Sequence, residues 1–132
     1  MDYQKFYKAG LCNIGDKEVI IRKKVFTFFL LITLVMTLLS INHHHHIWMI
    51  ILLFSSFFFT VLLWLEIRFS FCIFFGLFNL FNFSNPGNLE NVNDPEHCKK
   101  DRIKSLKLIS FSFILAALFT YIDYKMVCYI CE

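Results

Sequence analysis

The chain has 132 residues, of which 58% are hydrophobic and only 17% are charged, and its net charge is +3. This composition is too apolar for a small soluble domain, and the length supports one membrane domain. The lysines and arginines flank apolar stretches and lack the interleaved aromatic residues of a nucleic-acid-binding surface, so nucleic acid is not an expected partner. We therefore expect an integral membrane protein.

A basic segment, residues 1–24, precedes the first apolar stretch. Residues 13–15 form a turn signal, because Asn and Gly favour turns. Asp16 can then cap a helix that continues through Arg22 into the membrane. A strand over residues 19–21 is the alternative, but it would have no partner strand.

Three apolar stretches without a charged side chain predict three transmembrane helices, at residues 25–41, 47–65 and 108–122. A helix needs about 17 to 25 residues, at about 1.5 Å each, to cross a hydrocarbon core about 30 Å thick. The third stretch is the shortest, and Lys107 and Lys125 can extend from its ends to the headgroups. The predicted fold class is an all-α membrane protein.

The phenylalanine-rich residues 69–83 carry no charge, and Phe71, Phe74 and Phe78 recur at helical spacing. Two interpretations are open, a helix at the membrane interface (or one that re-enters the leaflet) and a fourth span. We favour the interfacial or re-entrant helix. A fourth span would leave only residues 66–68 as a turn, and it would move the basic residues 99–107 to the other side.

Residues 84–107 form a linker with two clear local signals. Asn85-Pro86-Gly87 predicts a turn. Asp94-Pro95-Glu96 combines a capping carboxylate, a proline at the first helical position and an acid in the first turn, which together indicate a helix start. We expect one helix from Glu96 through the last span.

Orientation follows from the basic residues, of which six lie in residues 1–24 and six in residues 66–107, whereas residues 42–46 have none and only Lys125 follows the last span. With the N-terminus inside, 12 of the 13 are cytoplasmic, as the positive-inside rule requires. We therefore expect a multi-pass protein of the inner (plasma) membrane, with residues 123–132 outside. The basic segments would meet anionic lipid headgroups.

Candidate metal ligands occur in two places on the predicted outer side. The link between the first two spans contains His43, His44, His45 and His46, and the tail contains Cys128 and Cys131 in a C-x-x-C arrangement. Imidazole and thiolate ligands suit zinc or copper, so metal binding or delivery is one hypothesis. The alternative is an ordinary polar turn and two unrelated cysteines, with no cofactor.

The spans contain no charged residue, and the chain has no phosphate-binding glycine loop, G-x-S-x-G or H-E-x-x-H motif. We therefore expect a non-enzymatic accessory or interaction subunit. Its partner would be another membrane protein or a second copy. The small residues Ser55-Ser56 and Ala116-Ala117 would allow close helix contact with that partner.

Three short strings resemble those of a group of small uncharacterised bacterial inner-membrane proteins. They are residues 12–15 (CNIG), residues 68–76 (RFSFCIFFG) and residues 101–104 (DRIK). The resemblance covers the layout of most of the chain and implies a bacterial inner-membrane setting, with no activity attached. It draws attention to Cys12 and Cys72 as a candidate pair. The histidine run and the C-terminal C-x-x-C are not part of it.

Overall fold

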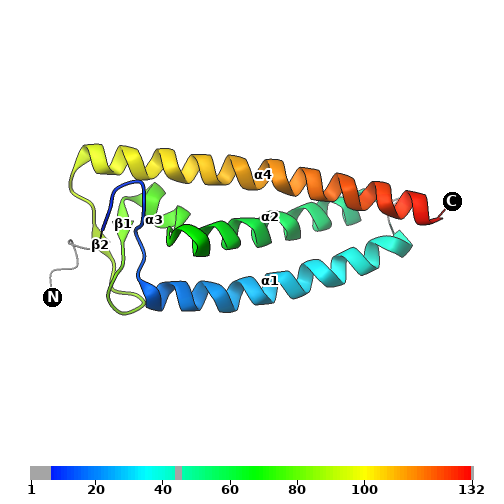
Figure 1. Ribbon diagram of the computed structural model, residues 1–132, viewed down its shortest axis with the longest axis horizontal. Coiled ribbons are helices and arrows are strands. Elements are labelled where there is room, and N and C mark those ends of the chain that lie inside the picture. Colours follow the sequence, from blue (N-terminus) through cyan, green and yellow to red (C-terminus); the bar gives the residue numbers. More distant parts are fainter. Residues whose placement is uncertain (1–6, 44–45, 132) are drawn as a thin grey trace.

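The computed structural model describes residues 7–43 and 46–131 as three long helices, one short helix and a two-stranded sheet (Figure 1). In chain order the elements are α1 (Asp16–His43), α2 (Ile47–Phe69), α3 (Ile73–Phe78), β1 (Leu80–Phe81), β2 (Glu90–Asn91) and α4 (Pro95–Cys131). The helices α1, α2 and α4 are long and apolar enough to cross a membrane. The prediction of a mainly helical protein with three membrane-spanning candidates is confirmed.

Helix α2 lies between α1 and α4 and packs along both, whereas α1 and α4 contact each other little. Helices α1 and α4 run in the same direction, and α2 runs against them (Figure 1). Residues 7–15 and 70–94, which include α3 and the sheet, gather at the end where α1 and α4 begin. We call these residues the cap. The α1–α2 link and the end of α4 lie at the opposite end of the bundle.

Both long helices that start at the cap begin where the sequence predicts. Helix α4 begins at Pro95, and the preceding Asp94 accepts a hydrogen bond from the Glu96 backbone N–H at 2.8 Å through its side chain. Helix α1 begins at Asp16, whose carboxylate lies in the first turn, where it interacts favourably with the helix dipole. The prediction that Asp16 is the capping residue is wrong by one position. Asp16 is the first helical residue, and its neighbour Gly15 accepts the first helical hydrogen bond, from Val19.

Small and hydroxyl side chains line the helix interfaces. Thr33 of α1 and Thr60 of α2 bring their hydroxyl oxygens to 2.8 Å from each other inside the bundle. On the first two thirds of α4 the buried residues recur every three or four positions and are mostly small: Asp101, Ser105, Leu108, Ser112, Ala116 and Thr120. Small residues let helix backbones approach closely. Ser56 and Ala116, expected to contact a partner protein, are instead buried within this chain, because the bundle uses them for its own packing.

The apolar core at the cap end joins α2, α3 and α4 through Val61, Leu65, Phe71, Ile73 and Leu108. Gly76 allows α3 to lie directly against α4. A Cβ at this position would clash with the Ser105 hydroxyl and would come within 2.7 Å of the Phe71 ring.

The predicted helix over residues 69–83 is much shorter in the structure. Helix α2 continues to Phe69 and ends at Ser70, and α3 ends at Asn79; both of these residues have the left-handed backbone that stops a helix, with φ of 47° and 60°. Beyond Asn79 the chain is extended and pairs with the linker, Phe81 opposite Glu90. Six residues of α3, at about 1.5 Å each, are too few to span a bilayer.

Two turns can be compared with the sequence. The predicted turn at Asn85-Pro86-Gly87 is present, with Asn88 N–H donating to Asn85 O at 3.1 Å and Gly87 at a φ of +95°. The predicted turn at residues 13–15 is wrong. The chain turns earlier, at Gly10 with a φ of +70°, and Ile14 is extended beside Asn82 because residues 13 and 14 pack inside the cap.

Candidate functional site

A buried group of charged side chains lies where the cap meets the first turns of the bundle. Arg22 of α1 contacts two carboxylates at once, Glu18 one turn earlier at 2.7 Å and Glu66 of α2 at 3.1 Å. Glu66 is only 4% exposed and Glu18 only 8%. Charges at such depth are retained only when an opposite charge and hydrogen bonds compensate for lost hydration.

The remaining oxygen of each carboxylate is also bonded. Glu66 accepts a hydrogen bond from the Ile73 backbone N–H at 2.8 Å, and Glu18 accepts one from the Asn82 side-chain amide at 3.0 Å. Ile73 begins α3 and Asn82 follows β1, so the network joins α1 and α2 to two parts of the cap. The cluster therefore holds the cap on the bundle.

A second contact fixes residues 7–15 to the start of α3. The Asn13 side chain accepts a hydrogen bond from Cys72 N–H at 2.7 Å and donates one to Cys72 O at 3.0 Å. Its own backbone O accepts from Asn82 N–H at 2.9 Å. Asn13 is fully buried and thus replaces the backbone partners that this irregular segment lacks.

Cys72, the one cysteine beside the charged cluster, is 2% exposed and forms no disulfide. Burial raises the pKa of its thiol, the Glu66 carboxylate raises it further, and Arg22 opposes both effects. A raised pKa keeps the thiol protonated at neutral pH, and nucleophilic cysteines need the opposite shift. Cys12, the other member of the candidate pair, is half-buried on the segment that Asn13 ties to Cys72.

Asp101 connects the third string of the resemblance to the same region. Its carboxylate is 0% exposed and accepts hydrogen bonds from the Tyr7 hydroxyl and from Gly10 N–H, each at 2.6 Å. Residues 12–15, 68–76 and 101–104, which are far apart along the chain, therefore meet around the cap. Asn13 pairs with Cys72, the backbone N–H groups of residues 13 and 14 donate to Ser70 O, and Lys104 lies over the Phe69 ring.

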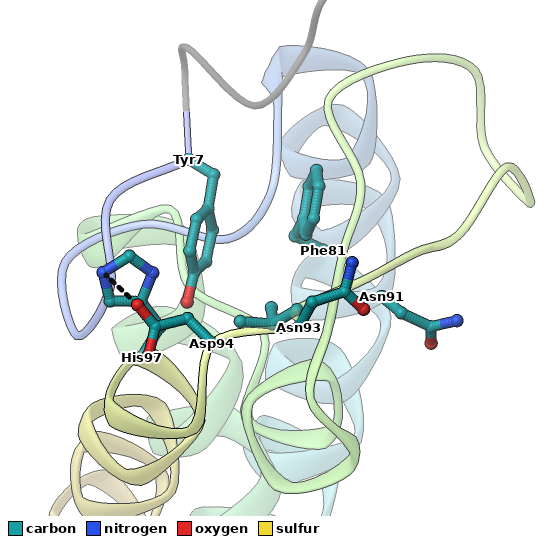
Figure 2. Close-up of a pocket in the computed structure, with 7 residues that line it drawn as sticks. Tyr7, Phe81, Asn91, Asn93, Asp94 and His97 are labelled. Atoms are coloured by element: carbon teal, nitrogen blue, oxygen red, sulfur yellow. Dashed lines mark ion pairs between the residues drawn. The ribbon is translucent and has the colours of Figure 1, made fainter.

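A cavity of about 350 Å³ opens on the cap (Figure 2). It is lined by Tyr7, Phe81, Asn91, Val92, Asn93, Asp94 and His97. The Tyr7 ring stacks on Phe81 with centroids 5.0 Å apart, and His97 Nε2 lies 3.7 Å from Asp94 Oδ2. Burial and the hydrogen bond to Asp101 raise the pKa of Tyr7, so its hydroxyl stays protonated as a donor. The cavity offers amides and one ion pair to a small polar group.

The six predicted metal ligands are only partly described. His44 and His45 lie outside the described residues, and of His43 and Cys131 only the backbone is described. His46 is exposed directly before α2, and Cys128 is half-buried on α4. Both segments lie at the end of the bundle opposite the cap (Figure 1). Among the side chains of residues 7–42 and 46–130, no three His, Cys, Asp or Glu form a group that could hold a metal. The metal hypothesis stays a prediction.

Sequence reasoning missed the buried network. Glu66 directly follows the predicted second span, and in the structure Arg22 and the α3 backbone enclose it. One signal was available. Glu18 and Arg22 are four residues apart, the spacing at which opposite charges meet on a helix. Nothing in the spacing indicated that Asn13 or Asn82 would be buried.

No known protein family, curated protein or solved structure matches the chain. The site is therefore interpreted from its own geometry.

We predict that Arg22→Met lowers the free energy of unfolding by about 3 to 5 kcal/mol, because it leaves two buried carboxylates without their cation. Tryptophan fluorescence of the purified protein during denaturant unfolding in detergent measures the change. Arg102→Met, at an exposed position of α4, is the matched control and should change it by less than about 0.5 kcal/mol. Adding Glu66→Gln to Arg22→Met should recover part of the loss. Equal stability of the two arginine variants would contradict a structural role for the network.

Proposed function

We propose that the chain is a non-enzymatic accessory or interaction subunit of a membrane. The observation that supports this most is that its buried polar side chains have their hydrogen-bond partners within the chain. Among the side chains that the structure describes, Asn79 Oδ1 is the single buried nitrogen or oxygen without a hydrogen-bond partner. A catalytic or transport site usually directs polar groups toward a substrate, whereas here Glu18, Arg22 and Glu66 bond to one another and to backbone.

Helix α1 offers the surface that such a role needs. Its buried residues are Glu18, Thr33 and Ser40, so its apolar side chains point mainly outward. We define the α1 outer face as Leu31, Leu34, Val35 and Leu38, which recur at helical spacing and are each more than half exposed. The face suits a transmembrane helix of another protein or of a second copy, because protruding leucine and valine side chains can fill the grooves of a facing helix.

The triple change Leu31→Ala, Leu34→Ala and Leu38→Ala should reduce complex formation by about tenfold or more, because it removes the protruding side chains of the α1 outer face. Native mass spectrometry after mild detergent extraction measures the fraction of protein in species heavier than the 15.8 kDa chain. Mass alone separates a second copy from a different partner.

The matched control is Ile114→Ala, Leu118→Ala and Ile122→Ala, three exposed positions of α4. It should leave the complex intact. A wild-type protein that is strictly monomeric, with no co-purifying protein, would count against an interaction role.

We further propose the inner-membrane orientation with the cap in the cytoplasm. Two observations support it. The basic starts of α1 and α4 both lie at the cap end, and the C-terminus lies at the far end of the bundle (Figure 1). This arrangement agrees with three crossings, with the phenylalanine-rich residues 69–83 at the cytoplasmic interface.

Cysteine labelling in intact cells tests the orientation. Cys98 and Cys128 are both half-buried and lie near opposite ends of α4. We expect a membrane-impermeant maleimide to label Cys128 from outside, and to label Cys98 only after the cells are opened. Single-cysteine variants keep the two signals separate. Labelling of Cys98 from outside would mean that the proposed orientation is wrong.

Metal binding is a second candidate function. The observation in its favour is that the end of α1 at His43, the start of α2 beside His46 and the end of α4 lie at the same end of the bundle (Figure 1). Purified wild-type protein should bind zinc or copper at near-stoichiometric level by elemental analysis. Replacing the four histidines with serines should remove most of this metal, while the link stays short and polar. Equal metal content in the two proteins would end this proposal.

A further inference from the structure

A groove of about 480 Å³ lies between the end of α2 and the first half of α4. Its lining residues come from these two helices: Trp64, Leu65, Arg68, Phe69, Lys104, Lys107, Leu108 and Phe111. On α2, Trp64 and Arg68 are four residues apart, and on α4, Lys104, Lys107 and Phe111 follow at spacings of three and four. The spacing places each set on one face of its helix, so cations and aromatic rings from both helices meet in the groove.

The charge of the groove is carried by three cations, Arg68, Lys104 and Lys107. Within the described part of the chain, neither Arg68, Lys104 nor Lys107 forms an ion pair. The nearest carboxylates along the chain are committed elsewhere, Glu66 to Arg22 and Asp101 to Tyr7. No acidic residue lines the groove.

The groove also has an apolar part that runs toward the middle of the bundle. Leu65 and Leu108 are buried at its base, and Trp64 and Phe111 are exposed along it. Lys104 lies over the Phe69 ring, with Nζ 4.1 Å from the centroid, so this cation is held at the groove by a cation–π contact. A second apolar groove, of about 430 Å³, shares Lys107 and Phe111 and extends along α4 to Ile114.

We propose that this groove binds one anionic phospholipid. The phosphate would lie among Arg68, Lys104 and Lys107, and the acyl chains would follow the two apolar grooves on either side of Phe111. Basic pockets between transmembrane helices are suited to anionic headgroups, because phosphate oxygens accept hydrogen bonds from arginine and lysine while the chains stay in hydrocarbon. The proposal rests on the membrane setting of the proposed function and not on the α1 outer face.

Charge and shape together favour a lipid over other occupants. A soluble anion would use the cations and leave the apolar walls uncovered. A neutral lipid would cover the walls and leave the three cations without an anion. An anionic phospholipid matches both parts of the groove at once, and it is available wherever the helices meet an anionic leaflet.

Fluorescence quenching can test this, since Trp64 lines the groove and the chain has only 2 tryptophans. Trp48→Phe leaves Trp64 as the single reporter. The full-length variant is reconstituted in phosphatidylcholine vesicles that contain phosphatidylglycerol. One of the two lipids carries brominated acyl chains, at the same mole fraction in each sample. We expect the preference of Trp64 for brominated phosphatidylglycerol to be about fivefold or more.

Two triple variants in the Trp48→Phe background separate a groove from a general basic surface. Arg68→Gln, Lys104→Gln and Lys107→Gln should bring the preference close to one. Lys23→Gln, Lys24→Gln and Lys99→Gln remove the same charge from exposed positions outside the groove and should keep it. A separate control is Trp64→Phe in the otherwise wild-type chain, which leaves Trp48 at the opposite end of α2 as the reporter. Its fluorescence should show no preference between the two lipids.

Equal quenching of Trp64 by the two brominated lipids would overturn the proposal. So would an equal loss in the two triple variants, because that result describes a diffuse basic surface. The triple alanine variant of the α1 outer face should keep the lipid preference. Failure of the interaction role and failure of the lipid site are therefore distinguishable in the same set of proteins.

Discussion

The position of the cap depends on one constraint, which is that carboxylates withdrawn from water must gain a cation and hydrogen-bond donors at the same place. Arg22 supplies the cation to Glu18 and to Glu66, and the cap supplies the donors through Ile73 N–H and the Asn82 amide. Neither the cation nor the donors are sufficient alone, because a buried carboxylate that lacks one of them is strongly destabilising. The bundle and the cap are therefore coupled, and displacement of α3 would take from Glu66 the Ile73 N–H that bonds its second oxygen.

Inside the bundle a different interaction dominates. Leucine and phenylalanine side chains gain little from leaving lipid, since acyl chains are as apolar as they are. The helices instead approach through small side chains such as Ser112 and Ala116, and Thr33 meets Thr60 across the α1–α2 interface. Most of the large apolar side chains of the three long helices are thereby left exposed. This division explains why α1, which has the fewest buried residues of the three long helices, offers the broadest surface to lipid or to a partner.

The basic residues near the cap occur in two environments, one enclosed and one exposed. Arg22 is enclosed and acts on other parts of the chain, whereas Arg68, Lys104 and Lys107 line a groove without acidic neighbours. Residues of the same type thus have different roles, because Arg22 stabilises the fold and the cations of the groove are candidate ligand contacts. The buried polar groups are satisfied by their own hydrogen bonds and ion pairs. Exposed surfaces, which are the groove and the α1 outer face, are therefore the parts of the protein that can contact a ligand or a partner.

Much of the architecture was determined by local sequence. Apolar stretches of sufficient length predicted the three long helices, and Asp94-Pro95 predicted the start of α4, because hydropathy and capping act over a few neighbouring residues. The conformation of the phenylalanine-rich segment and the composition of the charged site became evident only from the tertiary structure. Helical spacing over residues 69–83 did not reveal that Ser70 and Asn79 would end two helices, and no local pattern could bring Asn13 to Cys72, 59 residues away. The burial of a polar side chain depends on partners from distant segments, and these exist only once the chain has folded.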